Sequence, residues 1–531
     1  MAINFMNAMR NEETVSTENG ALGHKTTGKA LSDINFAVPH LRELAIVSNK
    51  QDKEIADDEL WELFLSAYRE NPVYALKWLL FLRDVRGGIG ERESFRAILR
   101  IMANKNEKQA LSLIRNIDIA EFGRFDDLVS ILNDVPNEAV EAIICKIIAQ
   151  INEDRIALDE GKNVSLLAKW LPSANTSSIR SRKLARKIAE KMNIKESEYR
   201  KLLSRLRKQI RIVETSLTNK EYASIDYASV PSKAALLYRG AFMRNDEERY
   251  SAYLKDVKEG KAEIKADAMF LHDIVHAYTE GSSFWSELNC KGFDETLEAQ
   301  WSAQKKFDDF KNTIVVRDGS GSMDTPIGGT TATALEVSTA IALYCADNND
   351  DCFHNKFVTF SDNPKVVDLH DCNTLHEKLI RAYREADWMG TDLQKTMRLI
   401  LNTAVSNNVP QDEIPSVLII SDMEFNEGVK HSYRNEDGEL EYASDETLMA
   451  TIAREYAEKG YSVPRIVFWN VNSRSGAIPM RENSAGLILV SGFSRSLIEL
   501  ACSNELDPYN ALIKVLDGER YSCVTDEIVV R

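Results

Sequence analysis

The sequence predicts a multidomain protein in which an all-α region of helical repeats, an α-solenoid, precedes a doubly wound α/β domain. The chain has 531 residues, more than a single hydrophobic core usually holds. Apolar residues recur at helical spacing over most of the first 300 residues, with little strand-like alternation. After residue 311, short apolar runs alternate with helical segments, which is typical of a mostly parallel sheet covered on both faces.

The bulk composition is that of an ordinary globular protein, with 44% hydrophobic and 28% charged residues. We find no apolar run long enough to cross a bilayer and no apolar signal core at the N-terminus, so we expect a cytoplasmic protein without a membrane partner. The seven cysteines form no CxxC pair, which favours reduced thiols over a zinc site. A net charge of −16 argues against binding nucleic acid over the whole surface, but it permits a local basic patch.

The helical region is expected to follow a polar arm. Residues 1–35 lack sustained periodicity and predict an extended or flexible segment, and residues 36–305 form the predicted helical domain. In "DDELWELFLSAYRENPVYALKWLLFLRDV", Leu60, Leu79 and Leu82 lie on recurring faces, and Asn71-Pro72 interrupts the pattern. Successive helix pairs of this size favour an α-solenoid, although no clean repeat period is present.

The predicted α/β domain covers residues 311–531. Its strands are expected in the apolar runs 312–316, 355–361, 364–369, 415–421, 464–471 and 486–492. Its helices are expected at 331–346, 375–384, 393–406, 446–459 and 494–501. In such a sheet, ligands bind in the crevice beyond the carboxyl ends of the strands. The first strand runs directly into "DGSGS", so this segment is a candidate functional loop.

The candidate loop carries oxygen ligands for a hard cation. Asp318, Ser320 and Ser322 supply a carboxylate and two hydroxyls, which suit Mg²⁺ or Mn²⁺, and the intervening glycines permit a tight turn. Thr391 precedes a predicted helix, and Asp422 ends a predicted strand at the same topological position as Asp318. The alternatives are a polar turn with Asp422 as a helix cap, or a phosphate-binding loop that lacks the usual Gly-Lys-Ser/Thr.

Taken together, Asp318-x-Ser320-x-Ser322, Thr391 and Asp422 resemble the metal-ion-dependent adhesion site (MIDAS) of von Willebrand factor A domains. The order of the predicted strands is also similar to that of this Rossmann-like fold. The resemblance implies Mg²⁺ or Mn²⁺ bound through Ser320, Ser322 and Thr391, with Asp318 and Asp422 acting directly or through water. It also implies that an acidic ligand completes the coordination sphere.

The helical region resembles the TROVE region of Ro-type RNA-binding proteins in "LRDVRGGIGERESFRAIL" (82–99) and "FGRFDDLVSIL" (122–132). The segments "LAKWLPSANTSS", "YRKLLSRLRKQIRIVE" and "IDYASVPSKAALLYRGAFMRND" are similar to a sister family of bacteria, phages and plants that also joins helices to an A domain. The Ro resemblance implies a ring of HEAT-like helical repeats closed by the A domain, which binds structured or misfolded RNA.

A basic segment gives this expectation partial support. Residues 180–211 contain thirteen Lys or Arg and three acidic residues. Two ridges of basic side chains on successive predicted helices can follow a phosphate backbone with salt-sensitive and largely sequence-blind affinity: Lys183, Lys187 and Lys191, then Lys201, Arg205 and Lys208. The alternative is a solvated surface paired with acidic neighbours. No aromatic stacking motif accompanies the ridges, so base-specific recognition is not expected.

Other features have competing interpretations. "RGGIGER" (86–92) is either a loop that approaches a phosphate or a helix-to-helix turn, and the turn is favoured. His272 and His276 are one helical turn apart, either as a metal pair or, as we favour, for packing. Arg317 stands where A domains usually have a small or apolar residue, where a cation would weaken metal binding or help to hold an anion. The polar insert 435–446 is a solvated loop or a gate over the metal.

The sequence therefore favours a non-enzymatic RNA-binding scaffold of the Ro type with a Mg²⁺-dependent ligand site in its A domain. The first alternative is a protein-interaction module that holds a partner's Asp or Glu through the metal. A metal-dependent hydrolase is a weaker alternative, because the sequence shows no nucleophile–base pair and only the segment Asp422-Met423-Glu424 beside the cation supports it.

Overall fold

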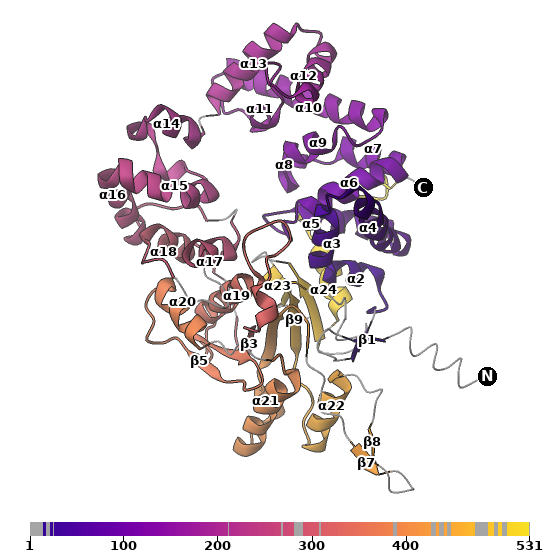
Figure 1. The fold of residues 1–531 in the computed structure, drawn as a ribbon, viewed down its shortest axis with the longest axis vertical. Coiled ribbons are helices and arrows are strands. Elements are labelled where there is room, and N and C mark those ends of the chain that lie inside the picture. The colour runs from indigo at the N-terminus through magenta and orange to yellow at the C-terminus, as the bar shows by residue number, and fades with distance from the viewer. Residues whose placement is uncertain are drawn as a thin grey trace, which may run out of the picture.

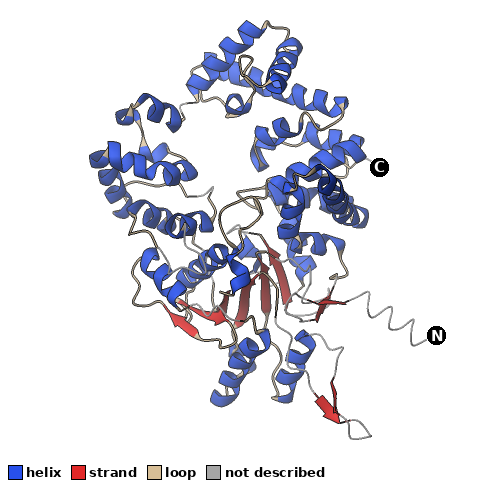
Figure 2. Ribbon diagram, in the orientation of Figure 1, coloured by secondary structure: helices blue, strands red, loops and turns tan. Residues whose placement is uncertain are grey.

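The computed structural model describes strands β1 (Thr14–Ser16) and β2 (Leu22–His24), and then residues 26–529 apart from 211, 267–268, 281–289, 307–309, 386–389, 426–431, 435–439, 443–447, 473–486, 493–496 and 502–506. It confirms the predicted fold class, an all-α region followed by an α/β domain (Figure 2). Most of the predicted insert 435–446 lies outside the described residues. No helix in the described part of the chain is long and apolar enough to span a bilayer.

The helices of the first region run as an arc (Figure 1). Their bounds are α2 Ala30–Phe36, α3 Val38–Ile46, α4 Lys50–Glu70, α5 Pro72–Arg83, α6 Glu93–Lys105, α7 Glu107–Asn116, α8 Ile119–Phe122, α9 Phe125–Ile131, α10 Asn137–Asp159, α11 Leu167–Trp170, α12 Ile179–Lys191, α13 Glu196–Gln209, α14 Val213–Asn219, α15 Ser232–Asn245, α16 Glu247–Lys258, α17 Leu271–Thr279 and α18 Glu295–Ser302. Helix α2 begins inside the predicted arm, residues 1–35. The prediction of an extended or flexible segment is therefore wrong for this end of the arm, because Leu31 and Ile34 are buried in the main core.

Local sequence explains the break between α4 and α5. Helix α4 begins after Asn49, whose side chain accepts a hydrogen bond from the Gln51 amide at 3.3 Å. Asn71 ends α4 and caps α5, where its side chain accepts from the Tyr74 amide at 3.1 Å. Pro72 then occupies the first position of α5, where a missing N–H costs nothing. Cap and proline together stop one helix and start the next, as the sequence predicts.

The α/β domain is built on a six-stranded sheet of order β10-β9-β6-β3-β4-β5. The strands are β3 Thr313–Asp318, β4 Lys356–Phe360, β5 Val366–Asp368, β6 Ser416–Ser421, β9 Ile466–Asn470 and β10 Leu487–Ser491. All neighbours pair in parallel except β4 and β5, which form an antiparallel edge. A separate hairpin pairs β7 (Ser432–Arg434) with β8 (Leu440–Tyr442). The six sheet strands fall within or close to the six predicted runs.

Helices cover both faces of this sheet. Alternate strand residues contribute to two different cores, since Val315 and Leu418 pack with one set of helices and Val316 and Ile419 with the other. The first set includes α19 (Ala334–Asn348) and α20 (Leu375–Arg384), and the second includes α21 (Leu393–Asn407) and α22 (Leu448–Glu458). Helix α23 (Leu497–Ala501) follows β10. This arrangement places the carboxyl ends of the parallel strands at one edge.

The C-terminal segment closes one end of the arc. Helix α24 (Pro508–Leu516), which the sequence did not predict, and the short 3₁₀-helix Glu519–Tyr521 leave the sheet and contact α5. The Tyr521 ring packs edge-on against Phe81 and stacks on Phe122, with centroids 5.9 Å apart in both pairs. Arg520 pairs with the fully buried Asp84, its second nitrogen 2.8 Å from Oδ1. The last residues of the chain thus belong to the packing of the helical region.

The other end of the arc also contacts the α/β domain. Glu298 of α18 accepts hydrogen bonds from the Leu375 and His376 amides at 2.8 and 3.0 Å, so it caps α20 from another domain. Trp301 Nε1 donates to Asp347 of α19 at 2.8 Å. Both ends of the helical arc are therefore fixed to the same α/β domain, and the chain path forms a closed circuit (Figure 1).

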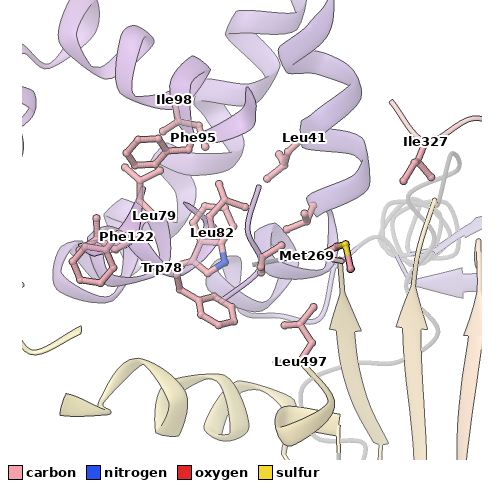
Figure 3. Close-up of a cluster of buried hydrophobic side chains, with 14 of the residues drawn as sticks. Leu41, Trp78, Leu79, Leu82, Phe95, Ile98, Phe122, Met269, Ile327 and Leu497 are labelled. Atoms are coloured by element: carbon pink, nitrogen blue, oxygen red, sulfur yellow. The ribbon is translucent and has the colours of Figure 1, made fainter. Parts of the chain in front are cut away.

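A continuous apolar core spans the junction. Buried side chains of the first helices, including Leu41, Trp78 and Leu82, belong to the same cluster as Ile327 and Leu497 of the α/β domain (Figure 3). Helices α14 to α16 enclose a different, aromatic-rich cluster around Phe242 and Tyr250. Helices α14 to α16 therefore have their own core, whereas α10 to α13, in the part of the arc opposite the sheet (Figure 1), belong to the cluster that reaches the α/β domain.

Removal of the Arg520 side chain is expected to destabilise the closed arrangement. In Arg520→Ala the buried Asp84 carboxylate keeps the Tyr521 hydroxyl but loses its cation, which should lower the free energy of unfolding by about 3 kcal/mol. Chemical denaturation measures this change. Arg69→Ala is the control, because Arg69 and Glu62 are 3.9 Å apart and exposed, and it should cost less than about 0.5 kcal/mol. Equal effects of the two substitutions would contradict the prediction.

Candidate metal centre

The predicted metal residues of the first loop lie at the carboxyl end of β3. Asp318 ends this strand and is fully buried. Its Oδ1 accepts a hydrogen bond from the Ser320 amide at 2.9 Å, and its Oδ2 accepts from the Ser421 hydroxyl at 2.6 Å. The Ser320 and Ser322 hydroxyl oxygens lie 3.0 Å apart. The alternating glycines allow the loop to turn back, so that both serines and the aspartate share one small volume.

The second loop follows the neighbouring strand. Asp422 comes directly after β6, which pairs in parallel with β3, so both carboxylates lie at the same edge of the sheet. Asp422 is fully buried, and it forms a hydrogen bond with the Ser322 side chain. Met423 has a φ of 65°, a conformation that non-glycine residues rarely adopt. Such a turn is costly, and strained residues of this kind gather at functional sites.

Thr391 brings the third loop to the same place. Its side chain is buried, and its hydroxyl donates to the carbonyl oxygen of Glu424 at 2.7 Å. The preceding Gly390 has a φ of 75°, and a Cβ there would lie 2.4 Å from the Asp362 carboxylate, so only glycine fits. The structure therefore groups Asp318, Ser320, Ser322 and Asp422 at one sheet edge, and it joins Thr391 to the loop that carries Asp422 through the Glu424 carbonyl.

The electrostatics of this cluster favour a cation. Burial raises the pKa of Asp318, and burial together with the nearby Asp318 charge raises the pKa of Asp422 to about 7. The described residues contain no group of three or more His, Cys, Asp or Glu arranged to hold a metal. The cluster instead combines two carboxylates with three hydroxyls, a donor set of hard oxygens. These residues fit Mg²⁺ or Mn²⁺, which would relieve the repulsion between the two buried carboxylates.

The side chain of Arg317 is directed away from this cluster. Because side chains alternate along a strand, it lies on the opposite face of β3 from Asp318. Its guanidinium donates to the Thr339 hydroxyl at 3.0 Å and to the Ala382 carbonyl at 3.1 Å, and it lies 5.5 Å from the centre of the Tyr383 ring. Burial lowers its pKa. Its positive charge nevertheless acts on Asp318 and lowers the pKa of that carboxyl against the stronger effect of burial, so the expectation that a cation beside the site affects metal or anion binding stays a prediction.

The two predicted basic ridges lie on α12 and α13 and divide into paired and exposed side chains. Lys187 and Lys191 form ion pairs with Glu141 of α10 at 3.2 and 2.6 Å, and Arg205 pairs with Asp159 at 3.2 Å. The other three are exposed, and no ion pair is found for them within the described residues: Lys183, Lys201 and Lys208. Half of the predicted cations are thus partly neutralised by acidic neighbours.

The glycine-rich segment 86–92 is a turn, as favoured. Gly90 has a φ of 80°, and a Cβ at Gly88 would lie 2.1 Å from the Phe81 carbonyl oxygen. The Arg86 guanidinium donates to the Glu121 carbonyl at 2.7 Å. Contacts within the protein therefore account for this segment, which is a turn between helices.

His272 and His276 have separate environments and do not form a metal pair. His272 is buried, its ring stacks on Phe270 at 5.2 Å, and burial lowers its pKa to about 4, so it is neutral. His276 faces the α/β domain, where its Nδ1 lies 2.9 Å from Glu336 Oε2. This contact between domains was not predicted, and neither was the support that Ser421 gives to Asp318. Ser421 directly precedes Asp422, and that adjacency is the only sequence signal for its role.

The fold and this cluster define a chain in which an arc of helices closes on a doubly wound α/β domain with hydroxyl and carboxylate oxygens at its strand ends. Residues 143–306 match a family described as "Domain of unknown function (DUF2828)", and residues 312–511 match "Domain of unknown function (DUF7788)". An uncharacterised protein of Acanthamoeba polyphaga mimivirus is 26% identical over 539 residues, covering 94% of this chain and 87% of that protein. The crystal structure of the Deinococcus radiodurans Ro (RSR) protein is similar over 91% of this chain and 87% of that one, with 15% identity and a TM-score of 0.36.

The raised pKa of Asp422 predicts how stability depends on pH without a divalent cation. The folded state binds the Asp422 proton more tightly than the unfolded state, so in EDTA stability should fall as pH rises from about 4 to about 7. Asp422→Asn should make the profile of unfolding midpoint against pH flatter, because one of the two buried charges is removed. Asp412→Asn, at an exposed position, is the control and should leave the profile unchanged. A profile for Asp422→Asn as steep as that of the wild type would contradict the assignment.

Proposed function

We propose that this chain is a non-enzymatic binding scaffold whose α/β domain holds Mg²⁺ or Mn²⁺ and presents it to an acidic ligand. The observation that supports the proposal is a set of hydrogen bonds that connects the three loops: Asp318 with Ser320, Ser322 with Asp422, and Thr391 with the Glu424 carbonyl. Ser320, Ser322 and Thr391 would supply neutral hydroxyl oxygens, and the two aspartates would bind the cation directly or through water. When bound, the cation supplies a positive coordination position for a carboxylate.

The donor set favours binding over catalysis. Three of its five side chains are uncharged hydroxyls, which offset the charge of a cation less than carboxylates do, so a bound cation would attract an anionic ligand. Activation of water would also need a residue that accepts a proton close to the cation. Glu424 is the nearest such residue, because it is buried beside Asp422 and its negative charge raises the pKa of Asp422. Its carboxylate would, however, be attracted to the same cation as the two aspartates. We therefore rank a metal-dependent hydrolase below a scaffold that binds an acidic side chain of a protein partner.

Cation binding is expected to depend on each loop. Calorimetric titration of Mn²⁺ or Mg²⁺ into the wild-type protein should show one saturable site, and Asp318→Ala should abolish it. Ser322→Ala should weaken the affinity by about tenfold, roughly the loss of one hydroxyl ligand. Thr403→Ala is the control, because its hydroxyl only donates to the Leu399 carbonyl within α21. Absence of cation binding at millimolar concentrations in the wild type would refute the proposal.

RNA binding is a second candidate function, and the exposed lysines of α12 and α13 favour it. Lys183, Lys201 and Lys208 are solvent-exposed on adjacent helices of an otherwise acidic protein. Such cations interact with phosphates without reading bases, so the expected RNA is structured or misfolded and bound with low sequence specificity. Lys187, Lys191 and Arg205 would first have to leave Glu141 and Asp159, so they are expected to contribute less.

Charge reversal tests this second candidate. Lys201→Glu combined with Lys208→Glu should weaken binding of a structured RNA by about tenfold or more, because two phosphate contacts become repulsive. The slope of log affinity against log salt should also become shallower by about two. Fluorescence anisotropy at several salt concentrations measures both. Lys255→Glu combined with Lys258→Glu, which changes two exposed lysines on α16, is the matched control. Equal losses in both variants would show that only the net charge matters.

A further inference from the structure

The loop that follows the metal motif contacts both ends of the helical arc. Gly328 and Gly329 lie against α3, where a Cβ on Gly328 would be 3.2 Å from Arg42 and one on Gly329 would be 3.6 Å from Ile46. Two residues further on, Thr331 Oγ1 lies 3.0 Å from His276 Nε2 of α17. The same short loop thus connects the candidate cation site with the first and the last parts of the arc.

His276 and Glu336 connect α17 with the start of α19. His276 Nδ1 lies 2.9 Å from Glu336 Oε2, and the Thr279 hydroxyl donates to the other oxygen of the same carboxylate. Glu336 also accepts a hydrogen bond from the Thr333 amide at 2.9 Å, so it completes the capping box of α19. Its side chain is buried. A single carboxylate therefore holds the first turn of α19 against α17.

The start of α19 is in turn hydrogen-bonded to the candidate cation site. The Ser338 hydroxyl, in the second turn of α19, donates to the carbonyl oxygen of Asp318 at 3.0 Å. Ser322 lies in the connection between β3 and α19, residues 319–333, and Glu336 lies in the first turn of the helix that this connection enters. Displacement of α19 relative to β3 would therefore alter the position of Asp318 and of the loop that carries Ser320 and Ser322.

We propose that cation binding at this site and the docking of α17 onto α19 are energetically coupled, with His276 and Glu336 acting as positioning residues. The proposal rests on the cation site proposed above. The coupling is reciprocal. If docking of α17 onto α19 increases the affinity for the cation, then binding of the cation must strengthen the docking by the same free energy. Through this coupling, binding of the cation in the α/β domain changes how tightly the end of the helical arc is held.

Protonation of His276 tunes the coupling. The hydrogen bond to Glu336 raises the pKa of His276, so the folded state favours the imidazolium ion. The resulting attraction is fully present below the ordinary pKa of histidine, near 6.5, and is lost as pH rises through the raised value. The charged or titratable groups around it are Glu336 of α19, Asp273 and Glu280 of α17, Lys233 of α15, which pairs with Asp273, and Tyr383 of α20 near Glu336.

The order hydroxyl, imidazole, carboxylate in Thr331, His276 and Glu336 also describes an activated nucleophile. Two features favour positioning instead. Glu336 is already engaged as the helix cap of α19 and as acceptor for Thr279, and the Thr331 hydroxyl is on a branched carbon that hinders attack. Covalent labelling of Thr331 is the outcome that would show a catalytic role instead.

The test is titration of Mn²⁺ into the full-length protein and its variants. His276→Gln and Thr331→Val should each weaken the affinity by about fivefold, the lower end for coupled sites, and Thr331→Ser should restore it. The ratio of the wild-type affinity to the His276→Gln affinity should be larger at pH 6 than at pH 8. Titration of the metal ligands affects both proteins equally, so it does not change this ratio. His370→Gln is the matched control, because His370 pairs with Asp368 at 2.8 Å on an exposed edge and should have no effect.

Hydrogen exchange measures the reverse direction. Saturating Mn²⁺ should slow exchange of the α17 amides in the wild type, and this protection should be lost in His276→Gln. Unchanged Mn²⁺ affinity in both His276→Gln and Thr331→Val, with normal binding by the wild type, would overturn the coupling and leave the cation site standing. Absence of Mn²⁺ binding in the wild type would overturn both. Covalent labelling of Thr331 by a fluorophosphonate would assign these residues to catalysis and overturn the positioning role.

Discussion

The parallel pairing of β3 and β6 is the constraint on which the site depends. It places Asp318 and Asp422 at one edge of the sheet, both without solvent exposure, where two negative charges repel each other strongly. The surrounding residues respond to this charge. The Ser320 amide and the Ser421 hydroxyl donate to Asp318, and Ser322 pairs with Asp422. Protonation of one carboxylate or binding of a cation would relieve this repulsion, and the hydroxyl oxygens suit a hard cation.

The closed circuit of the chain follows from polar contacts that join residues far apart in sequence. Arg520 and Asp84 are 436 residues apart, and Glu298 caps a helix that begins 77 residues later. Arg520 neutralises the Asp84 carboxylate, and Glu298 accepts hydrogen bonds from the first amides of α20. Both groups would be costly to bury without a partner. Because the apolar core beside them is continuous between the domains, the two ends of the arc are held by packing as well as by charge.

Much of this architecture could be predicted from the sequence, because it depends on local patterns. Asn71-Pro72 stops one helix and starts another, and Asp318 and Asp422 each follow an apolar run at the end of a parallel strand. What escaped prediction depends on distant partners. Helix α24 has an apolar face whose partner is α5, some 430 residues earlier. Likewise, nothing near Lys187 or Lys191 in the sequence indicates that Glu141 of another helix neutralises them.

The position of the cation site at the junction has a further consequence. A site on an isolated α/β domain would transmit ligand binding only to its own helices. Here the loop after Ser322 contacts α3 through Gly328 and α17 through Thr331, so the proposed coupling would share the free energy of ligand binding with contacts that close the arc. Helices α10 to α13 share the core that reaches the sheet, whereas α14 to α16, around Phe242, have a separate core. Changes at the junction are therefore expected to move these helices as a unit.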